Sequence, residues 1–393
     1  MLVFLLITGI LTSPLYLLPS GSIQIYHGIL ALMSLMALFH TGGLKTKPVV
    51  VLVVAFWAYL IIRQTLFIMA SAEADIATLL YPTLNMAVFL GVYMVLTEVA
   101  TPRAIKRVLA AIAAVLVFEI GYIFIENGSL TFFMHSNIRS TGTFNNPNQL
   151  GYFALLMGCA YVAISSTLQS TKWHGAFFVS LAYLLATISL SKAAMLAIAP
   201  LLLFSLTSWV GEIRSTLLKA FVFTIVPVLL ILIALIAFSH FEGLMNSENE
   251  VIRRLALIGQ DSDDTLIARG YALVLNPDER LVFGYGEGFY NMLYGNEVHS
   301  TLANVLTSFG IVGFLLFLAM LLHVVQFRIL SQHFGLVSLV LAYGLTHNGL
   351  RNTLFWVFLA IIAWSAEQAG LADKKNKLSI TTLGPVAQRR VRA

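Results

Sequence analysis

Long apolar runs alternate with short polar links along almost the whole chain. An α-helix needs roughly 20 predominantly apolar residues to cross a hydrocarbon layer of about 30 Å. The pattern therefore predicts an all-α, polytopic membrane protein with about twelve spans. These predicted spans cover residues 2–18, 23–40, 48–66, 76–97, 108–125, 148–168, 174–191, 193–210, 218–239, 300–324, 332–346 and 352–368.

One long polar interruption, residues 240–300, stands between the ninth and tenth predicted spans. It divides the chain into a helical block at 1–239, a loop at 240–299, a second helical block at 300–368 and a tail at 369–393. No internal repeat or low-complexity segment is visible. The loop is the segment in which we expect chemistry, because the helical blocks hold few charges.

The loop has local patterns of its own. Apolar residues at helical spacing within 250–259 predict a short amphipathic helix that lies on the membrane face. The acidic stretch 261–264 is a helix-start signal, and it predicts a second helix that ends at Leu275, before Asn276-Pro277. The glycine-rich run 284–288 predicts a turn whose backbone comes close to a neighbouring segment.

Composition supports the membrane assignment. The chain is 59% apolar and 10% charged, whereas soluble globular proteins are about 45–50% apolar and about 25% charged. Its one cysteine, Cys159, excludes an intrachain disulfide. The first apolar run has no basic segment before it and no small-residue cleavage site after it, so we expect it to be retained as a span.

Basic residues predict the orientation. If the N-terminus is cytoplasmic and the spans alternate, 15 of the 23 lysines and arginines fall on the inner side, with at least one in every inner link. Both termini are then cytoplasmic and the 240–300 loop lies outside. The basic tail is expected to face anionic lipid, so the net charge of +5 does not indicate nucleic acid as a partner.

The link before the sixth span is the richest in polar residues on the outer side. Asn146-Pro147 predicts a helix start, and Asn145 and Asn148 can cap backbone groups there. Arg139 has the planar donor geometry that binds phosphate oxygens in pairs. The plainer alternative for these residues is a capped helix end with a surface arginine.

Further outer cations are Lys192, Arg269, Arg280 and Arg351, and His347 lies near the last of them. A lysine at the outer end of a span opposes the positive-inside bias, which favours a binding role. The alternatives are snorkelling of the long side chains to the interface, ion pairs with neighbouring aspartates, and helix capping.

His299 is the sharpest single candidate. It begins a segment that reads His299-Ser300, nine residues, Gly310, two residues, Gly313. Both glycines fall on one face of the tenth span, where they would permit close helix packing below the histidine. A neutral imidazole can accept a proton from a sugar hydroxyl, and nearby cations suit a phosphate-activated lipid donor. A lone histidine at a helix start can also be a polar cap.

No cluster with metal-ligand spacing is present on the outer side, so neither a metal nor another cofactor is expected. Glu119 lies inside the fifth span, where burying a charged carboxylate is unfavourable in free energy. It could pair with Arg63 or Arg139, or face a wet cleft.

At these residues the chain resembles the O-antigen ligase and polymerase superfamily of bacterial envelope glycan assembly. His299, Ser300, Gly310 and Gly313 match the H-[N/S/Q]-x9-G-x2-G signature of ligase-type members. The run 142–151, GTFNNPNQLG, resembles the G-T-F-x-N-P-N-x-L segment of polymerase-type members. Many members have S-R-G after the seventh span, whereas this chain has Ser191-Lys192-Ala193. A twelve-span layout with a large outer loop is also typical of the superfamily.

The resemblance implies a metal-independent glycosyltransferase in the bacterial inner membrane. Its donor would be a glycan on undecaprenyl pyrophosphate, taken from the periplasmic side. His299 would be the base that activates the acceptor hydroxyl. The residues expected to bind the donor are Arg139, Arg269, Arg280, Lys192, Asn145 and Asn148.

Two acceptors are compatible with the motifs. The asparagine-rich segment favours a polymerase that joins lipid-linked repeat units, with a chain-length regulator as a partner. The histidine motif favours a ligase that moves a finished glycan onto lipid A-core. A transporter or flippase would show internal repeats and charges inside its spans, and a glycan-binding or structural membrane protein has no motif in its favour.

Overall fold

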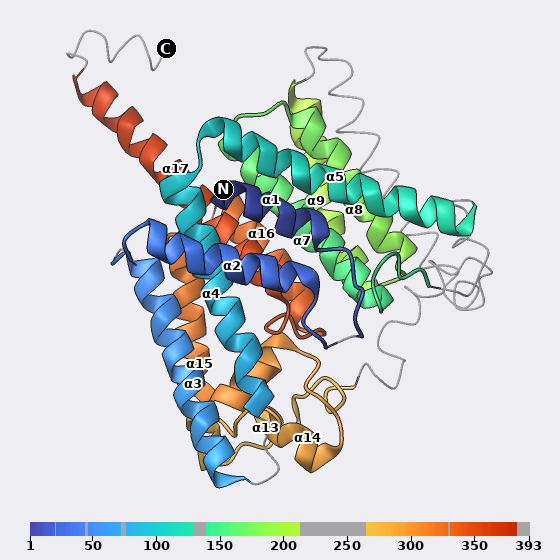
Figure 1. The fold of residues 1–393 in the computed structure, drawn as a ribbon, viewed down its shortest axis with the longest axis vertical. Helices are drawn as coiled ribbons and strands as arrows, with labels where there is room; N and C mark the ends of the chain where they lie inside the picture. The colour runs from blue at the N-terminus through green and yellow to red at the C-terminus, as the bar shows by residue number, and fades with distance from the viewer. Residues whose placement is uncertain are drawn as a thin grey trace, which may run out of the picture.

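The computed structural model describes residues 1–19, 21–43, 46–71, 76–128, 139–212, 265–328 and 331–382. These residues form helices and turns, with no strand among them (Figure 1). Helices suit a hydrocarbon environment because each one satisfies its backbone hydrogen bonds within its own segment. The longer helices are α1 (Leu2–Thr12), α2 (Ile25–His40), α3 (Pro48–Ala70), α4 (Leu80–Met94), α5 (Pro102–Asn127), α7 (Pro147–Thr167), α8 (Lys172–Ile188), α9 (Lys192–Glu212), α15 (Thr301–Val324), α16 (Gln332–Gly344) and α17 (Thr353–Thr382).

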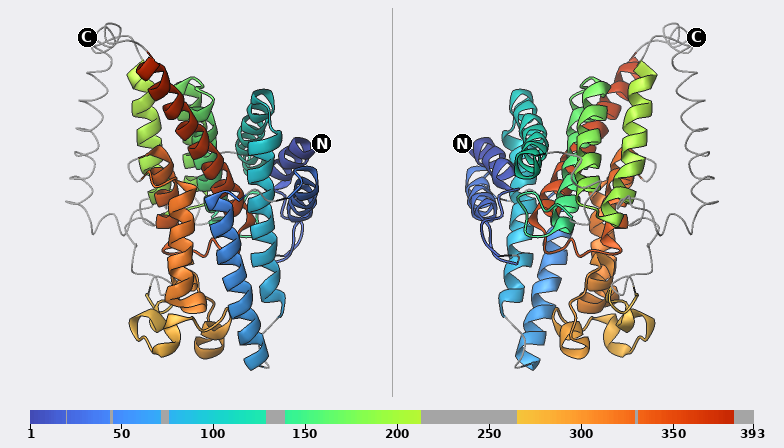
Figure 2. Two further views of the ribbon diagram at one scale, coloured as in Figure 1. Left: turned by 90° about the vertical axis from the view of Figure 1, so that its left-hand side faces the viewer. Right: turned by 90° about the vertical axis from the view of Figure 1, so that its right-hand side faces the viewer.

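Short helical elements extend or join them. A 3₁₀ turn at Ile76–Leu79 leads into α4, and a π-helical turn at Val95–Val99 extends it. Three short elements, α13 (Ala272–Leu275), η4 (Glu279–Val282) and α14 (Phe289–Tyr294), precede α15. Figures 1 and 2 show α13 and α14 gathered at one end of α3 and α15.

Every predicted span that falls in the described residues contains a helix, and the span predicted at 218–239 lies outside them. Among the described residues, seven helices are long and apolar enough to cross a membrane, as expected for a multi-pass membrane protein. The predicted first span, 2–18, is wrong in length. Its helix ends at Thr12, because Pro14 has no N–H with which to continue the hydrogen-bond ladder.

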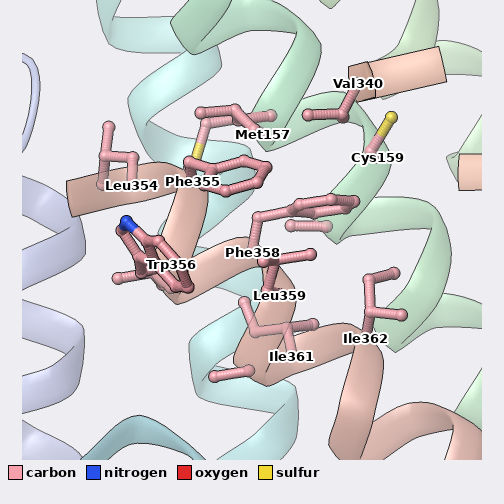
Figure 3. Packing of buried hydrophobic residues seen from close by; sticks show 14 of the residues in the cluster. Met157, Cys159, Val340, Leu354, Phe355, Trp356, Phe358, Leu359, Ile361 and Ile362 are labelled. Atoms are coloured by element: carbon pink, nitrogen blue, oxygen red, sulfur yellow. The ribbon is translucent and has the colours of Figure 1, made fainter. Parts of the chain in front are cut away.

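The core lies between α7 and α17. In the apolar 18-residue segment of α7, 89% of the residues are buried inside the protein, whereas the corresponding share in α3 is 33%. Phe355, Trp356 and Phe358 of α17 are almost inaccessible to solvent. Figure 3 shows them in one cluster with Met157 of α7 and Val340 of α16. Helices that are apolar all round suit the interior, whereas the exposed apolar side of α3 suits contact with lipid.

Ion pairs connect the middle and C-terminal part of α17 to neighbouring parts of the chain. Lys47 Nζ lies 2.8 Å from Glu367 Oε1, and the Tyr93 hydroxyl donates to Oε2 of the same carboxylate at 2.7 Å. Arg328 pairs with Asp373 in the same way. The lysine and the arginine both belong to links predicted to be cytoplasmic, so these two links lie along the same part of α17.

The predicted helix from 261–264 to Leu275 is wrong over most of its described part. Residues 265–270 form turns, and only Ala272–Leu275 is α-helical. Gly270 interrupts the helix with a φ of +93°, and a Cβ there would lie 2.4 Å from a methyl carbon of Val298. The predicted end at Leu275 is confirmed, while the amphipathic segment 250–259 lies outside the described residues.

Candidate functional site

A cleft of about 1010 Å³ lies where several helix N-termini meet. Its lining includes residues at or just before the first turns of α7, α9, α15 and α17, together with the link between α16 and α17. Each helix N-terminus carries a partial positive charge and unsatisfied N–H groups. The arrangement therefore favours an anionic ligand before any side chain is considered.

The charged side chains of the lining are predominantly basic. The basic residues are Arg139, Lys192, Arg269 and Arg351, and the acidic residues are Glu287 and Glu297. Arg351 bonds to both carboxylates, through Nε to Glu287 at 2.8 Å and through Nη1 to Glu297 at 3.1 Å. Burial lowers the pKa of Arg351, but these two carboxylates outweigh burial and raise it overall.

Arg139 enters the cleft beside the start of α7. Its Nη2 donates to Asn148 Oδ1 at 2.6 Å and its Nε donates to the Ser189 carbonyl at 3.1 Å. The backbone carbonyl of Asn148 in turn accepts from the Tyr343 hydroxyl at 3.0 Å. Asn148 lines the cleft and also orients Arg139, so the guanidinium is held in place from two sides.

The predicted helix start at Asn146-Pro147 is confirmed. Asn146 is the N-cap of α7, and its Oδ1 accepts the Asn148 N–H at 2.7 Å. Asn145 has a different role, because its side chain donates to the Leu18 carbonyl at 2.9 Å. It does not line the cleft, whereas Asn146 does.

His299 lies on the cleft with its side chain exposed. The next residue fixes its backbone, because Ser300 is the N-cap of α15 and its hydroxyl also donates to the Gly344 carbonyl at 3.0 Å. The Tyr271 hydroxyl contacts the same Ser300 oxygen at 2.8 Å. No hydrogen-bond partner of the His299 imidazole is found within the described ranges, so no described residue occupies either ring nitrogen.

The other predicted cations divide into two groups. Arg269 lies in the cleft, where its Nη1 donates to the Thr346 carbonyl at 2.7 Å, and Lys192 begins α9 at the cleft wall. Arg280 lies elsewhere, 2.6 Å from Asp278, and it stacks 5.1 Å above the ring of Tyr285. Its hydrogen bond, followed by that of Tyr285, lowers the pKa of Asp278 to about 2.

The cleft therefore brings together five of the predicted site residues, namely His299, Arg139, Lys192, Arg269 and Asn148, and does not include Arg280 or Asn145. Arg351, which was not among the residues expected to bind the donor, is the main omission. The sequence held an indication of this role, because Arg351 is one of the basic residues predicted to lie on the outer side.

Glu119 pairs with neither of its predicted partners. It is fully buried, and its carboxyl group bonds to the hydroxyl and the backbone N–H of Thr143. A Cβ on the neighbouring Gly142 would lie 2.3 Å from Glu119 Oε2. The carboxyl group thus anchors the segment that leads into α7.

The glycine motif has a different role from the one predicted. Gly310 breaks α15 with φ 70° and ψ −172°. The carbonyls of Thr307 and Ser308 accept instead from the N–H groups of Tyr285 and Gly286, at 2.8 and 2.9 Å. Gly310 thus meets loop backbone rather than another helix, and only Gly313, close to Tyr59, serves helix packing. The close approach predicted for residues 284–288 is confirmed.

Polar side chains of α3 hold the loop at this break. The Tyr59 hydroxyl bonds to the carbonyls of Phe283 and Phe309 at 2.9 and 3.0 Å. Arg63 Nε donates to the Gly284 carbonyl at 2.9 Å. Gln64 accepts the Glu287 N–H at 2.7 Å. These bonds place Glu287 beside Arg351, so the break in α15 is connected to the cleft.

No family model matches the chain, and no curated protein matches its sequence. Within the described ranges, no three His, Cys, Asp or Glu side chains are grouped closely enough to hold a metal ion.

We expect Gly310→Ala to release the loop from α15. A Cβ at this position would lie 2.3 Å from the Gly284 nitrogen, and the positive φ would be strained by about 1–3 kcal/mol. Hydrogen exchange over residues 284–288 should become at least about tenfold faster. Gly335→Ala on α16, where a Cβ meets nothing within 4 Å, is the matched control. Unchanged protection in Gly310→Ala would contradict the docking.

Proposed function

We propose that the chain is a membrane-embedded glycosyltransferase of the O-antigen polymerase and ligase type. Its donor is a glycan linked to undecaprenyl pyrophosphate, and it uses no cofactor. The observation that carries this proposal is the cleft in which His299, an available proton acceptor, lies with Arg139, Lys192 and Arg269 at the meeting point of helix N-termini.

The basic residues bind the donor pyrophosphate. Arginine matches phosphate oxygens with paired N–H groups, and Arg139 is already oriented by Asn148 and the Ser189 carbonyl. Such pre-organisation lowers the entropy that is lost on binding. Lys192 supplies a point charge at the N-terminus of α9, where the helix dipole adds to the attraction.

Transfer then needs one base and a stabilised leaving group. The oxygen of an acceptor hydroxyl attacks the anomeric carbon of the donor sugar, and the bond from that carbon to the phosphate oxygen breaks. Undecaprenyl pyrophosphate leaves with the electron pair, and His299 takes the proton of the hydroxyl. The cations stabilise the negative charge that develops on the departing pyrophosphate.

The proposed topology has twelve spans, cytoplasmic termini, and the cleft and the 240–300 loop on the periplasmic side of the bacterial inner membrane. The ion pairs of Lys47 and Arg328 support it, because these residues belong to links predicted to be cytoplasmic. Their partners on α17, Glu367 and Asp373, lie about 20 Å and about 30 Å along the helix from the end that adjoins the cleft.

The acceptor is proposed to be a second lipid-linked repeat unit, so that the chain acts as a polymerase. The alternative is lipid A-core, which would make it a ligase. The ligase alternative has the His299 signature in its favour, and the polymerase reading has the asparagine-rich segment around Asn146. Both use the same donor chemistry.

Replacing His299 should remove transfer without affecting folding. General-base catalysis contributes about 10²–10⁴-fold, so His299→Ala should lower the transfer rate by at least about 100-fold, measured with purified protein and lipid-linked glycan. His40→Ala, at the exposed end of α2, is the control. A fully active His299→Ala protein would rule out the base.

Lysine substitutions at Arg139 and at Arg280 test the donor site, with Arg280 as the control position outside the cleft. Arg139→Lys keeps the charge but loses the paired donors, so kcat/KM should fall about tenfold or more. Arg280→Lys should have little effect, because Arg280 lies outside the cleft and binds Asp278. Equal losses in the two variants would indicate general electrostatics of the loop instead of a pyrophosphate site.

The glycan profile of cells that lack the chain separates polymerase from ligase. Loss of a polymerase should leave a single repeat unit attached to lipid A-core. Loss of a ligase should leave full-length chains on the undecaprenyl carrier. Profiles resolved by electrophoresis measure the difference, and an unchanged profile would contradict both.

A further inference from the structure

The cleft has a second wall that the transfer chemistry above does not use. Tyr16, Tyr26, His27 and Tyr81 all line it. Their rings form a chain of contacts, with centroids 6.2 Å apart for Tyr16 and Tyr26, 4.0 Å apart for Tyr26 and His27, and 6.0 Å apart, edge to face, for His27 and Tyr81. We name these four side chains the aromatic wall. None of them has a carboxylate, ammonium or guanidinium group, so the wall differs chemically from the cationic part of the cleft.

Other elements hold the aromatic wall in place. The irregular turn before α2 is closed by the Gln24 side chain, which bonds to the N–H and the carbonyl of Leu18 at 3.0 and 2.8 Å. Asn145 donates to the same carbonyl from the α7 side. The Tyr81 hydroxyl, from α4, donates to the Gly21 carbonyl at 2.8 Å. Three separate parts of the chain thus order one short turn at the edge of the cleft.

The hydrogen bond at one ring nitrogen of His27 determines which nitrogen carries the proton. Its Nδ1 accepts the backbone N–H of Gln24 at 2.8 Å, as part of the capping of α2. A nitrogen that accepts carries no proton, so the ring is neutral and its proton is on Nε2. His27 is only 4% exposed and lines the cleft. No partner for Nε2–H is found among the residues that the structure describes.

These features suit a sugar ring better than a phosphate or a lipid tail. A phosphate is bound best by cations, which the aromatic wall lacks. A lipid tail would exclude water from the Nε2–H and offer it no acceptor, which is unfavourable. A sugar has apolar C–H faces that can pack on aromatic rings and hydroxyl groups that can accept from a fixed donor.

We propose that the aromatic wall of Tyr16, Tyr26, His27 and Tyr81 is a carbohydrate subsite, in which His27 Nε2–H donates to a hydroxyl of one sugar ring. The proposal rests on the proposed function, because it assigns a place in the same cleft to the glycan that is transferred. It also gives Asn145 a role as a positioning residue of this subsite, through its bond to Leu18.

The test separates sugar binding from pyrophosphate binding in the full-length protein. One probe is the glycan of the source cells released from its lipid carrier, which has no phosphate, and the other is farnesyl pyrophosphate, which has no sugar. His27→Gln is the informative variant, because glutamine at the third helical position can also accept the cap N–H and so preserve the start of α2. His40→Gln at the other end of α2 is the control.

His27→Gln should weaken binding of the released glycan about tenfold, equivalent to about 1.4 kcal/mol, and leave farnesyl pyrophosphate binding unchanged. Arg139→Ala should weaken farnesyl pyrophosphate binding. In the transfer assay, a KM raised for the acceptor assigns the subsite to the acceptor sugar, and a KM raised for the donor assigns it to the donor sugar.

The proposal is overturned if the released glycan does not bind the wild-type protein, or if His27→Gln binds it as tightly as the wild type does. Failure of the proposed function would look different. The wild-type protein would then neither bind farnesyl pyrophosphate nor transfer glycan, while glycan binding and its dependence on His27 could still be measured.

Discussion

Backbone hydrogen bonds that are broken within a hydrophobic bundle must find new partners, and at Gly310 this requirement shapes the end of the structure where the loop before α15 meets the bundle. An unsatisfied carbonyl in hydrocarbon is strongly unfavourable. The carbonyls freed in α15 are satisfied by Tyr285 and Gly286 of the loop. The loop backbone can approach this closely only because Gly284 and Gly310 have no side chains, since a Cβ on either would lie within 2.6 Å of the other segment. The loop is therefore integrated into the helix bundle at this point.

The same contact determines where charge lies in the cleft. Docking against α15 and α3 places Glu287 at 6% exposure, where its carboxylate needs a partner, and Arg351 supplies one. Arg351 also binds Glu297, two residues before His299. A network of hydrogen bonds and ion pairs thus runs from α3 through the loop to Glu297, close in sequence to the residue proposed as base. The two carboxylates are both engaged by one arginine, so the lining keeps an excess of positive charge, in keeping with a phosphorylated ligand.

Features that depend on local sequence were predictable, and features that depend on tertiary contact were not. Apolar length located the long helices of the described residues, Asn146-Pro147 identified the start of α7, and the glycines at 284–288 indicated a close backbone approach. The ion-pair partners of the arginines were not predictable in this way. Arg280 and Arg351 both follow short polar stretches, yet one pairs with its neighbour Asp278 and the other reaches carboxylates more than fifty residues earlier in the chain. Likewise, Gly310 looks like a helix-packing glycine until the loop that meets it is known.

The anchoring of His299 would allow the base proposed at this position to be rigidly placed and still able to take a proton. A general base must be well placed, but a side chain already committed to hydrogen bonds cannot easily take a proton from substrate. Here the placement comes from the backbone, because Ser300 is held by Gly344 and Tyr271 at the cap of α15. The imidazole has no partner within the described residues, so its nitrogens stay available. His27 illustrates the opposite arrangement, in which one ring nitrogen is fixed as an acceptor and the other can act only as a donor. The two histidines of one cleft are thus suited to different tasks, proton acceptance at His299 and hydroxyl recognition at His27.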